Sequence, residues 1–191
     1  TRNGSGGAIE GTAGDAVSLS DALNVTLRSM TLKNTSGSTT SDAVDSSGGA
    51  HIALLGVTVE NPAGYGWRAV NLAGANRVED SLITKINGTQ TSAVWLESNS
   101  SVTLALADNT ISDSLSDQAL VVLRALGTAQ ATLDVDNCTF TGLASTALKA
   151  LAGDASSSTA TVNLKVKNSD FTSAKAASLP TLAGGLGNLE S

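Results

Sequence analysis

Apolar and polar residues alternate in short runs along this chain, and the runs return at a nearly constant spacing. A dipeptide of Ala followed by Val or Leu marks each return. It occurs at Ala16-Val17, Ala43-Val44, Ala69-Val70, Ala93-Val94, Ala119-Leu120 and Ala147-Leu148, with steps of 27, 26, 24, 26 and 28 residues. Self-similarity at a period of about 20 to 50 residues is typical of stacked repeat architectures.

A second pattern lies inside each period: two alternate positions that are apolar except for Asn76 in the third period, then a turn-forming residue, then one more apolar residue three positions later. The turn residues are Ser29, Gly56, Asp80, Asp108, Asn137 and Asn168, and the later apolar residues are Leu32, Val59, Ile83, Ile111, Phe140 and Phe171. Alternation with a period of two predicts a strand with one buried face. Because the turn residues tolerate a left-handed or bent backbone, they predict tight corners between strands.

These repeats predict an all-β fold, a right-handed parallel β-helix of about six coils with three short strands in each coil. Each strand is expected to pair with the same strand of the next coil. The β-helix is expected to cover residues 15–178. Residues 1–14 form a Gly-rich segment or partial coil in this interpretation, and residues 179–191 form a tail or cap.

The inward residues of successive coils should stack into columns. The first sheet is expected to stack Val17, Val44, Val70, Val94, Leu120 and Leu148, and the second sheet Leu27, Leu54, Val78, Leu106, Val135 and Val166. A core of aliphatic columns agrees with a composition of 41% hydrophobic but only 3% aromatic residues.

Charge and composition narrow the classes of partner. The formal net charge is -6, and the 11 Lys and Arg residues are scattered singly. A basic surface that follows phosphates is therefore not expected, which argues against nucleic acid. No apolar run approaches the roughly 18 residues of a spanning helix, so we expect no membrane insertion by this segment. The single Cys138 is expected at an outward or corner position, without a disulfide.

The segment Ser101-Val102-Thr103-Leu104-Ala105-Leu106-Ala107-Asp108-Asn109-Thr110-Ile111 resembles the repeats of pectate-lyase-like right-handed β-helices, most of all those of autotransporter passengers and bacterial adhesin stems. The resemblance covers about residues 14 to 178. It implies a structural or adhesive segment of a bacterial secreted or cell-surface protein, located outside the cell. The implied partner is a host or neighbouring-cell surface, a glycan, or another copy of the chain.

For the enzymes of this superfamily, the resemblance implies calcium-binding carboxylates with an arginine base, or an aspartate pair with a His and an Arg-x-Lys. Neither pattern fits this chain. The outward row of the first sheet is expected to contain Ser18, Asp45, Asn71, Trp95, Val121 and Lys149, with a single carboxylate. The only histidine, His51, lacks the partners of a triad or a zinc site. We therefore favour a protein without catalytic residues, metal or cofactor.

Three of the five large aromatic residues, Tyr65, Trp67 and Trp95, fall close together in the predicted third and fourth coils. An exposed Trp beside Arg and Asn suits sugar stacking. The candidate ligand-binding residues are Trp67, Arg68, Asn71 and Trp95. They support the alternative function, a carbohydrate-binding or carbohydrate-active (lyase or hydrolase) β-helix, unless Trp67 instead folds over a loop as a local lid.

Overall fold

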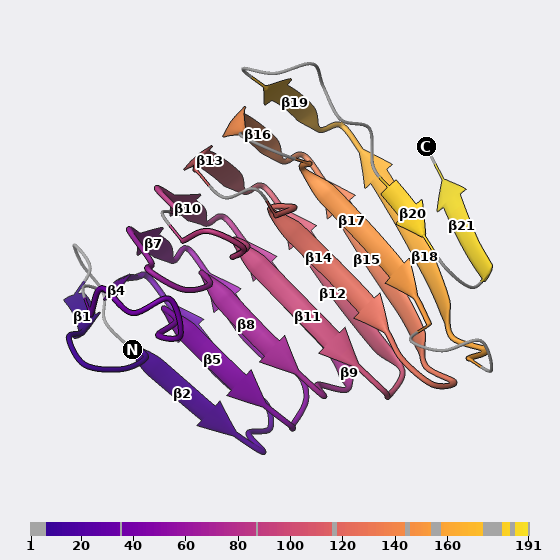
Figure 1. Cartoon of the computed structure of the whole chain (residues 1–191), viewed down its shortest axis with the longest axis horizontal. Helices are drawn as coiled ribbons and strands as arrows, with labels where there is room; N and C mark the ends of the chain where they lie inside the picture. Colours follow the sequence, from indigo (N-terminus) through magenta and orange to yellow (C-terminus); the bar gives the residue numbers. More distant parts are fainter. Residues whose placement is uncertain are drawn as a thin grey trace.

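The computed structural model describes residues 7–34, 36–86, 88–115, 118–143, 146–153, 158–173, 181–183 and 186–190. Within these ranges the chain winds into a β-solenoid whose regular elements are all strands. Three sheets of seven parallel strands run along its length. The all-β parallel β-helix of about six coils is therefore confirmed (Figure 1).

Each coil contributes one strand to each sheet. The first sheet contains β2 (Val17–Ser20), β5 (Val44–Ser47), β8 (Trp67–Val70), β11 (Val94–Ser98), β14 (Val121–Ala125), β17 (Leu148–Ala152) and β20 (Thr181–Ala183). The second contains β3 (Thr26–Arg28), β6 (Ala53–Leu55), β9 (Gly74–Glu79), β12 (Val102–Ala107), β15 (Gln130–Asp136), β18 (Thr161–Lys167) and β21 (Leu186–Glu190). The third contains β1 (Gly7–Gly11), β4 (Met30–Asn34), β7 (Thr58–Glu60), β10 (Leu82–Thr84), β13 (Thr110–Ser114), β16 (Thr139–Leu143) and β19 (Asp170–Ser173).

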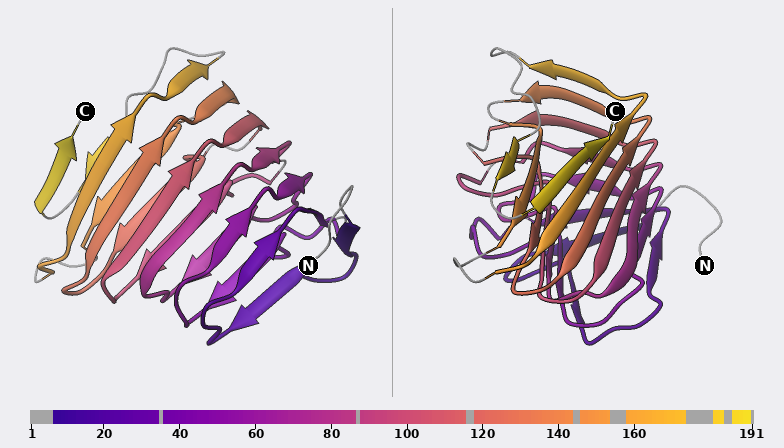
Figure 2. Two further views of the ribbon diagram at one scale, coloured as in Figure 1. Left: turned by 180° about the vertical axis from the view of Figure 1, so that it is seen from behind. Right: turned by 90° about the vertical axis from the view of Figure 1, so that its right-hand side faces the viewer.

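The strands of one sheet lie side by side in chain order, as the two further views also show (Figure 2). Near the N-terminus β1 pairs with β4, and near the C-terminus β20 and β21 pair with β17 and β18. Both ends of the chain thus add strands to the three sheets. The expected boundaries at residues 14 and 178 stay predictions. The described residues include no helix long and apolar enough to cross a membrane.

All six predicted turn residues adopt the left-handed backbone conformation that a tight corner needs. Their φ angles are 49° at Ser29, 58° at Gly56, 50° at Asp80, 56° at Asp108, 50° at Asn137 and 48° at Asn168. Five of the six carry side chains, which is unusual outside Asn, Asp and Gly. The corner between the second and third sheets therefore repeats with the same geometry in every coil.

The residue after four of these six corners is buried, and this corrects the prediction for Cys138. Its side chain is 1% exposed. Its Sγ lies 3.5 Å from the carbonyl oxygen of Leu106, and its backbone N–H donates to Ser169 Oγ at 3.0 Å. Burial raises the pKa of the thiol. The left-handed corner at Asn137 turns the next side chain, that of Cys138, into the interior. The alternation of apolar residues alone does not reveal this turn.

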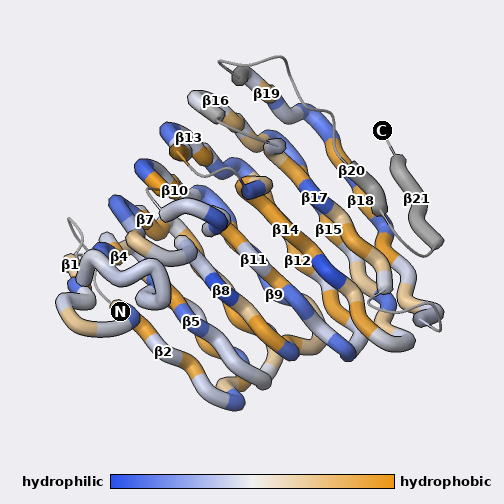
Figure 3. The backbone as a smooth tube through the Cα atoms, viewed as in Figure 1, coloured by the Kyte–Doolittle hydropathy of each residue, from blue (hydrophilic) through white to orange (hydrophobic). Residues whose placement is uncertain are grey.

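The predicted second-sheet column is confirmed in register, and the apolar residues after the corners form a further column in the third sheet. The second-sheet column pairs Leu27, Leu54, Val78, Leu106, Val135 and Val166 in succession. The third-sheet column pairs Leu32, Val59, Ile83, Ile111, Phe140 and Phe171, and the two Phe rings at its end stack at 4.9 Å. The alternation of hydrophobic and hydrophilic residues along the strands can be followed in Figure 3.

The first-sheet column was wrong at two of its six positions. Trp67, not Val70, pairs with Val44 and Val94, and Val121, not Leu120, pairs with Val94 and Leu148. Val70 instead ends its strand beside Ser47 and Glu97. A shift by an odd number of residues exchanges the faces of a strand. The repeated dipeptide therefore marks the coil but not the register of its first strand.

Candidate functional site

A cavity of mixed acidic, basic, hydroxyl and aromatic lining lies where the first three coils enter the first sheet. Its volume is about 350 Å³. It is lined by Asp15, Thr39, Thr40, Asp42, Asp45, Tyr65 and Arg68. We call it the aspartate cavity. Its wall comes from the starts of β2, β5 and β8 and from the loop that precedes β5.

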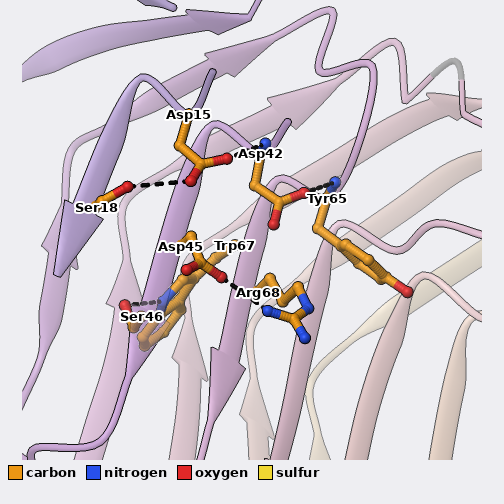
Figure 4. Close-up of polar contacts among 8 residues, drawn as sticks. All are labelled: Asp15, Ser18, Asp42, Asp45, Ser46, Tyr65, Trp67 and Arg68. Carbon is orange, nitrogen blue, oxygen red and sulfur yellow. Dashed lines mark hydrogen bonds and ion pairs between the residues drawn. The ribbon is translucent and has the colours of Figure 1, made fainter. Parts of the chain in front are cut away.

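Two aspartates of the aspartate cavity connect successive coils through the backbone. Asp15 Oδ1 accepts the N–H of Asp42 at 2.7 Å, and Asp42 Oδ1 accepts the N–H of Tyr65 at 2.7 Å. The other oxygen of Asp15 accepts the hydroxyl of Ser18 at 3.0 Å. Figure 4 shows this ladder crossing three coils. The backbone N–H groups fix where both carboxyl groups stand, because each is held by a short hydrogen bond.

Asp42 is the most strongly perturbed group of this cavity. Its side chain is 3% exposed. Burial raises the pKa of Asp42 to about 7, and the charges of Asp15 and Asp45 add to the effect, while the Tyr65 N–H and the Arg68 guanidinium oppose it. Its Oδ1 accepts the Tyr65 N–H at 2.7 Å. Asp42 also lines the cavity, so the perturbed carboxyl group belongs to its wall.

The outer wall of the cavity combines an ion pair with two aromatic rings. Arg68 Nη1 lies 3.0 Å from Asp45 Oδ1, and both side chains are partly exposed. Trp95 pairs with Arg68 in the outward row, one coil further along. The Trp95 ring is 5.9 Å from the Tyr65 ring at an interplanar angle of 59°. Two aromatic rings thus adjoin the ion pair on the solvent side of the first sheet.

Trp67 lies on the opposite side of β8, so its expected exposure is wrong. It is 0% exposed and fills the core column between Val44 and Val94. Its indole Nε1–H donates to Ser46 Oγ at 3.0 Å, in the interior behind the Asp45–Arg68 pair (Figure 4). Trp67 therefore cannot offer its ring to a ligand in this structure, and it is not a lid over a loop.

Asn71 is also displaced from its expected place. It follows the last residue of β8 and turns the chain at the next corner with φ 59°. Arg68, and not Asn71, pairs with Trp95. Of the four candidate ligand-binding residues, the structure brings Arg68 and Trp95 together, buries Trp67 and leaves Asn71 three residues away from Arg68 at the end of the strand.

The outward row of the first sheet is correspondingly revised to Ser18, Asp45, Arg68, Trp95, Val122 and Lys149. Asp45 is the single carboxylate of that row, as predicted from the uncorrected register. The sequence reasoning missed Asp15 and Asp42, which reach the same cavity from the strand starts. One signal could have found them: Asp precedes the Ala-Val dipeptide in the first two repeats, as Asp15-Ala16-Val17 and Asp42-Ala43-Val44.

His51 lies elsewhere, at the corner between the first and second sheets. It is exposed, with φ 60°, and lines a different hollow together with Asn24 and Arg77. Across the described residues, no group of three or more His, Cys, Asp or Glu side chains is arranged to hold a metal ion. The carboxyl groups of the aspartate cavity are used instead for backbone hydrogen bonds and the Arg68 ion pair.

Comparisons of the chain with protein-family models, with curated proteins and with solved structures gave no match. The β-solenoid and its repeats therefore rest on the sequence and the structure of this chain.

The raised pKa of Asp42 predicts how stability depends on pH. Between about pH 4 and pH 7 the folded chain keeps the Asp42 proton that the unfolded chain has already lost, so raising the pH destabilises the fold. At 1.36 kcal/mol per pKa unit the loss approaches about 4 kcal/mol by pH 8. Asp42→Asn keeps an oxygen for the Tyr65 N–H and has no proton to lose. We expect urea unfolding to show that the stability advantage of the variant grows from pH 4 to pH 8. A constant difference between the two proteins over this range would contradict the prediction.

Proposed function

We propose that this chain is a carbohydrate-binding, adhesive β-helix segment of a bacterial secreted or cell-surface protein, with the aspartate cavity and its aromatic neighbours as the binding site. The observation that carries the proposal is the placement of Tyr65 and Trp95 against the Asp45–Arg68 ion pair. The partner in this proposal is a glycan of a host or neighbouring-cell surface.

The chemistry of the site suits sugars. Aromatic faces pack against the apolar C–H faces of a sugar ring, while charged and hydroxyl groups bind its hydroxyls. Here Tyr65 lines one cavity together with Asp45, Arg68 and Thr40. Trp95 adjoins it through its contact with the Tyr65 ring and its pairing with Arg68. The volume of about 350 Å³ is near the lower end of the range for small-ligand sites, which is roughly 300 to 1,000 Å³.

The hydrogen bonds of the acids favour binding over catalysis. A glycosidase needs one carboxyl group to protonate the leaving oxygen and another to act as base or nucleophile. Asp15 is held by Ser18 and the Asp42 backbone, and Asp45 is held by Arg68. These two groups hold the coils and the ion pair in place, so the proposal contains no catalytic step.

A second candidate function is a structural stem without a ligand. It is favoured by the three unbroken parallel sheets and by the aliphatic columns that continue through the coils. A stem would pair with surfaces along its length and would not need the Tyr65–Trp95 contact. A glycan array separates the two candidates, because the stem predicts no bound glycan and the proposed function predicts a defined set.

Trp95→Ala tests the proposed site. Truncating an aromatic anchor of a binding site costs on the order of 2 kcal/mol, or roughly thirtyfold in Kd. Because Trp95 is outward and only partly buried, the Tm should change by no more than a few degrees. Titration calorimetry with the glycan found on the array measures the first effect, and thermal unfolding the second.

Lys149→Ala is the matched control, since Lys149 occupies the same outward row two coils further along. It should leave both Kd and Tm unchanged. Equal affinities for wild-type protein and Trp95→Ala would remove Trp95 from the site, and a steep fall in Tm would show that its ring supports the fold instead.

A further inference from the structure

A second cavity adjoins the aspartate cavity. Its volume is about 470 Å³, and it is lined by Asn34, Gly37, Thr39, Asn61, Ala63, Gly88 and Thr89. We call it the amide cavity. Thr39 lines both cavities, so they meet at this residue. The amide cavity spans the ends of the third-sheet strands β4 and β7 and the segment that leads toward β11, whereas the aspartate cavity opens on the first sheet.

The loop that carries Thr39, between β4 and β5, separates the two cavities and is anchored by the side chain of Asn34. Asn34, which is 2% exposed, donates from Nδ2 to the carbonyl oxygens of Gly14 at 2.9 Å and Asp42 at 3.1 Å. Its Oδ1 accepts the N–H of Ser36 at 3.0 Å. The side chain of Asn34 therefore ties the loop to the coil before it and to the aspartate ladder. Thr39 and Thr40, further along this loop, are exposed, and the Thr40 hydroxyl lies 2.8 Å from that of Ser38.

The two cavities differ in charge. The aspartate cavity has three carboxyl groups against one guanidinium. None of the described residues that line the amide cavity carries a charge; they supply amide, hydroxyl and backbone groups. An anionic ligand would be repelled by the carboxyl groups of the first cavity, because like charges oppose binding, and would find no cation in the second. A ligand rich in hydroxyl groups suits both.

We propose that the aspartate cavity and the amide cavity are successive subsites for one uncharged oligosaccharide of at least three sugar units, which crosses the loop at Thr39. This inference rests on the proposed carbohydrate-binding function and adds to it the length and the charge class of the ligand. One unit packs against Tyr65 in the aspartate cavity, one crosses at Thr39, and one meets Asn61 and Thr89 in the amide cavity, where the amide of Asn34 supports the wall.

The test measures how affinity depends on oligosaccharide length. The probes are neutral oligomers of glucose, mannose, galactose and xylose from two to six units, with oligogalacturonates of the same lengths, titrated against the whole chain. We expect at least one neutral series to gain tenfold or more in affinity between two and four units. Oligogalacturonates should bind at least tenfold more weakly than the best neutral hexamer.

A variant that fills only the amide cavity tests whether the gain in affinity with oligosaccharide length comes from that cavity. Thr89 is exposed and lines the amide cavity but not the aspartate cavity. Thr89→Trp should lower the affinity of the hexamer to that of the dimer, roughly tenfold, and leave the dimer unaffected. Thr110→Trp, at an exposed threonine of the third sheet outside both cavities, is the matched control and should change neither affinity.

The outcomes separate the two proposals. Affinity that is independent of length, or a hexamer that binds Thr89→Trp as well as wild type, overturns the second subsite while the carbohydrate-binding function stands. Oligogalacturonates that bind as tightly as the neutral hexamers overturn the charge class alone. Failure of every probe and of the glycan array together overturns the proposed function, and the two-subsite inference with it.

Discussion

Leu106→Asp is expected to prevent folding of the whole solenoid. Leu106 is 1% exposed and pairs with Val78 and Val135 in the middle of the second-sheet column. A carboxylate at this position would be buried without a partner, at a cost of several kcal/mol, in addition to the lost apolar contacts. A domain has about 5–15 kcal/mol of stability in total. Far-UV circular dichroism should show loss of the β signal, and size-exclusion chromatography an expanded or aggregated chain.

Thr103→Asp is the control on the same strand. Thr103 lies on the outward face of β12, paired with Ala75 and Thr132, and its side chain is partly exposed. The same charge placed there stays in contact with water, so the unfolding free energy should change by no more than roughly 1 kcal/mol. If both variants lose the β signal equally, the assigned faces of β12 are incorrect.

The second and third sheets could be predicted from the sequence because each coil contains two independent signals for them. Alternating apolar residues set the inward face, and a residue suited to a left-handed backbone ends the strand. In the fourth coil, Leu104 and Leu106 are followed by Asp108, whose φ is 56°. A one-residue error in the alternation would move the corner onto a residue that resists it, so the two signals fix one register.

In the first sheet the second signal is present in the first three coils, where Asp21, Gly48 and Asn71 follow the strands with φ of 49°, 70° and 59°. In the fifth coil Val121, Val122 and Leu123 are all apolar and all buried, so alternation cannot say which of them points inward. In the third coil the inward residue that pairs with Val44 is Trp67. The repeated dipeptide Ala69-Val70 therefore ends three residues after the column position, whereas Ala43-Val44 ends on it. The corner residue Asn71 follows Trp67 by four positions, as Gly48 follows Val44, so it could have fixed the third coil. In the fifth coil packing decided the position, because the local sequence does not distinguish the three apolar residues.

The candidate site was predicted only in part for the same reason. Trp95 was correctly placed on the outward face, but its neighbour depends on the register of β8 and is Arg68. The aspartate ladder joins residues 27 and 23 positions apart in the chain, from Asp15 to Asp42 and from Asp42 to Tyr65. Such contacts follow only once the coils are aligned.

The aspartate ladder links the stability of the first three coils to the form of the cavity. Asp42 holds the backbone of Tyr65, and the Tyr65 ring lines the cavity and meets Trp95. The unfavourable burial of the Asp42 carboxyl group therefore occurs in the wall of the proposed binding site. Natural proteins tolerate such strained or perturbed groups mainly at functional sites, which supports assigning the binding role to this cavity.

Trp67→Ala is expected to destabilise the fold strongly, unlike Trp95→Ala. The Trp67 ring is the largest fully buried side chain, and its removal leaves a cavity between Val44 and Val94 that costs about 3–5 kcal/mol. The hydroxyl of Ser46 also loses its donor in the interior. At roughly 2–4 °C per kcal/mol for a chain of this size, the Tm should fall by about 6–20 °C.

Trp67→Phe separates packing from the hydrogen bond, since it keeps a ring in the column but has no N–H for Ser46. Its Tm should lie between those of wild type and Trp67→Ala. Below the Tm, folded Trp67→Phe should still bind the glycan within about twofold of wild type, because the ring at position 67 faces the core and not the ligand. If Trp67→Ala instead keeps the wild-type Tm and abolishes glycan binding, Trp67 is a surface residue. The face assignment of β8 would then be reversed, and Arg68 would leave the site.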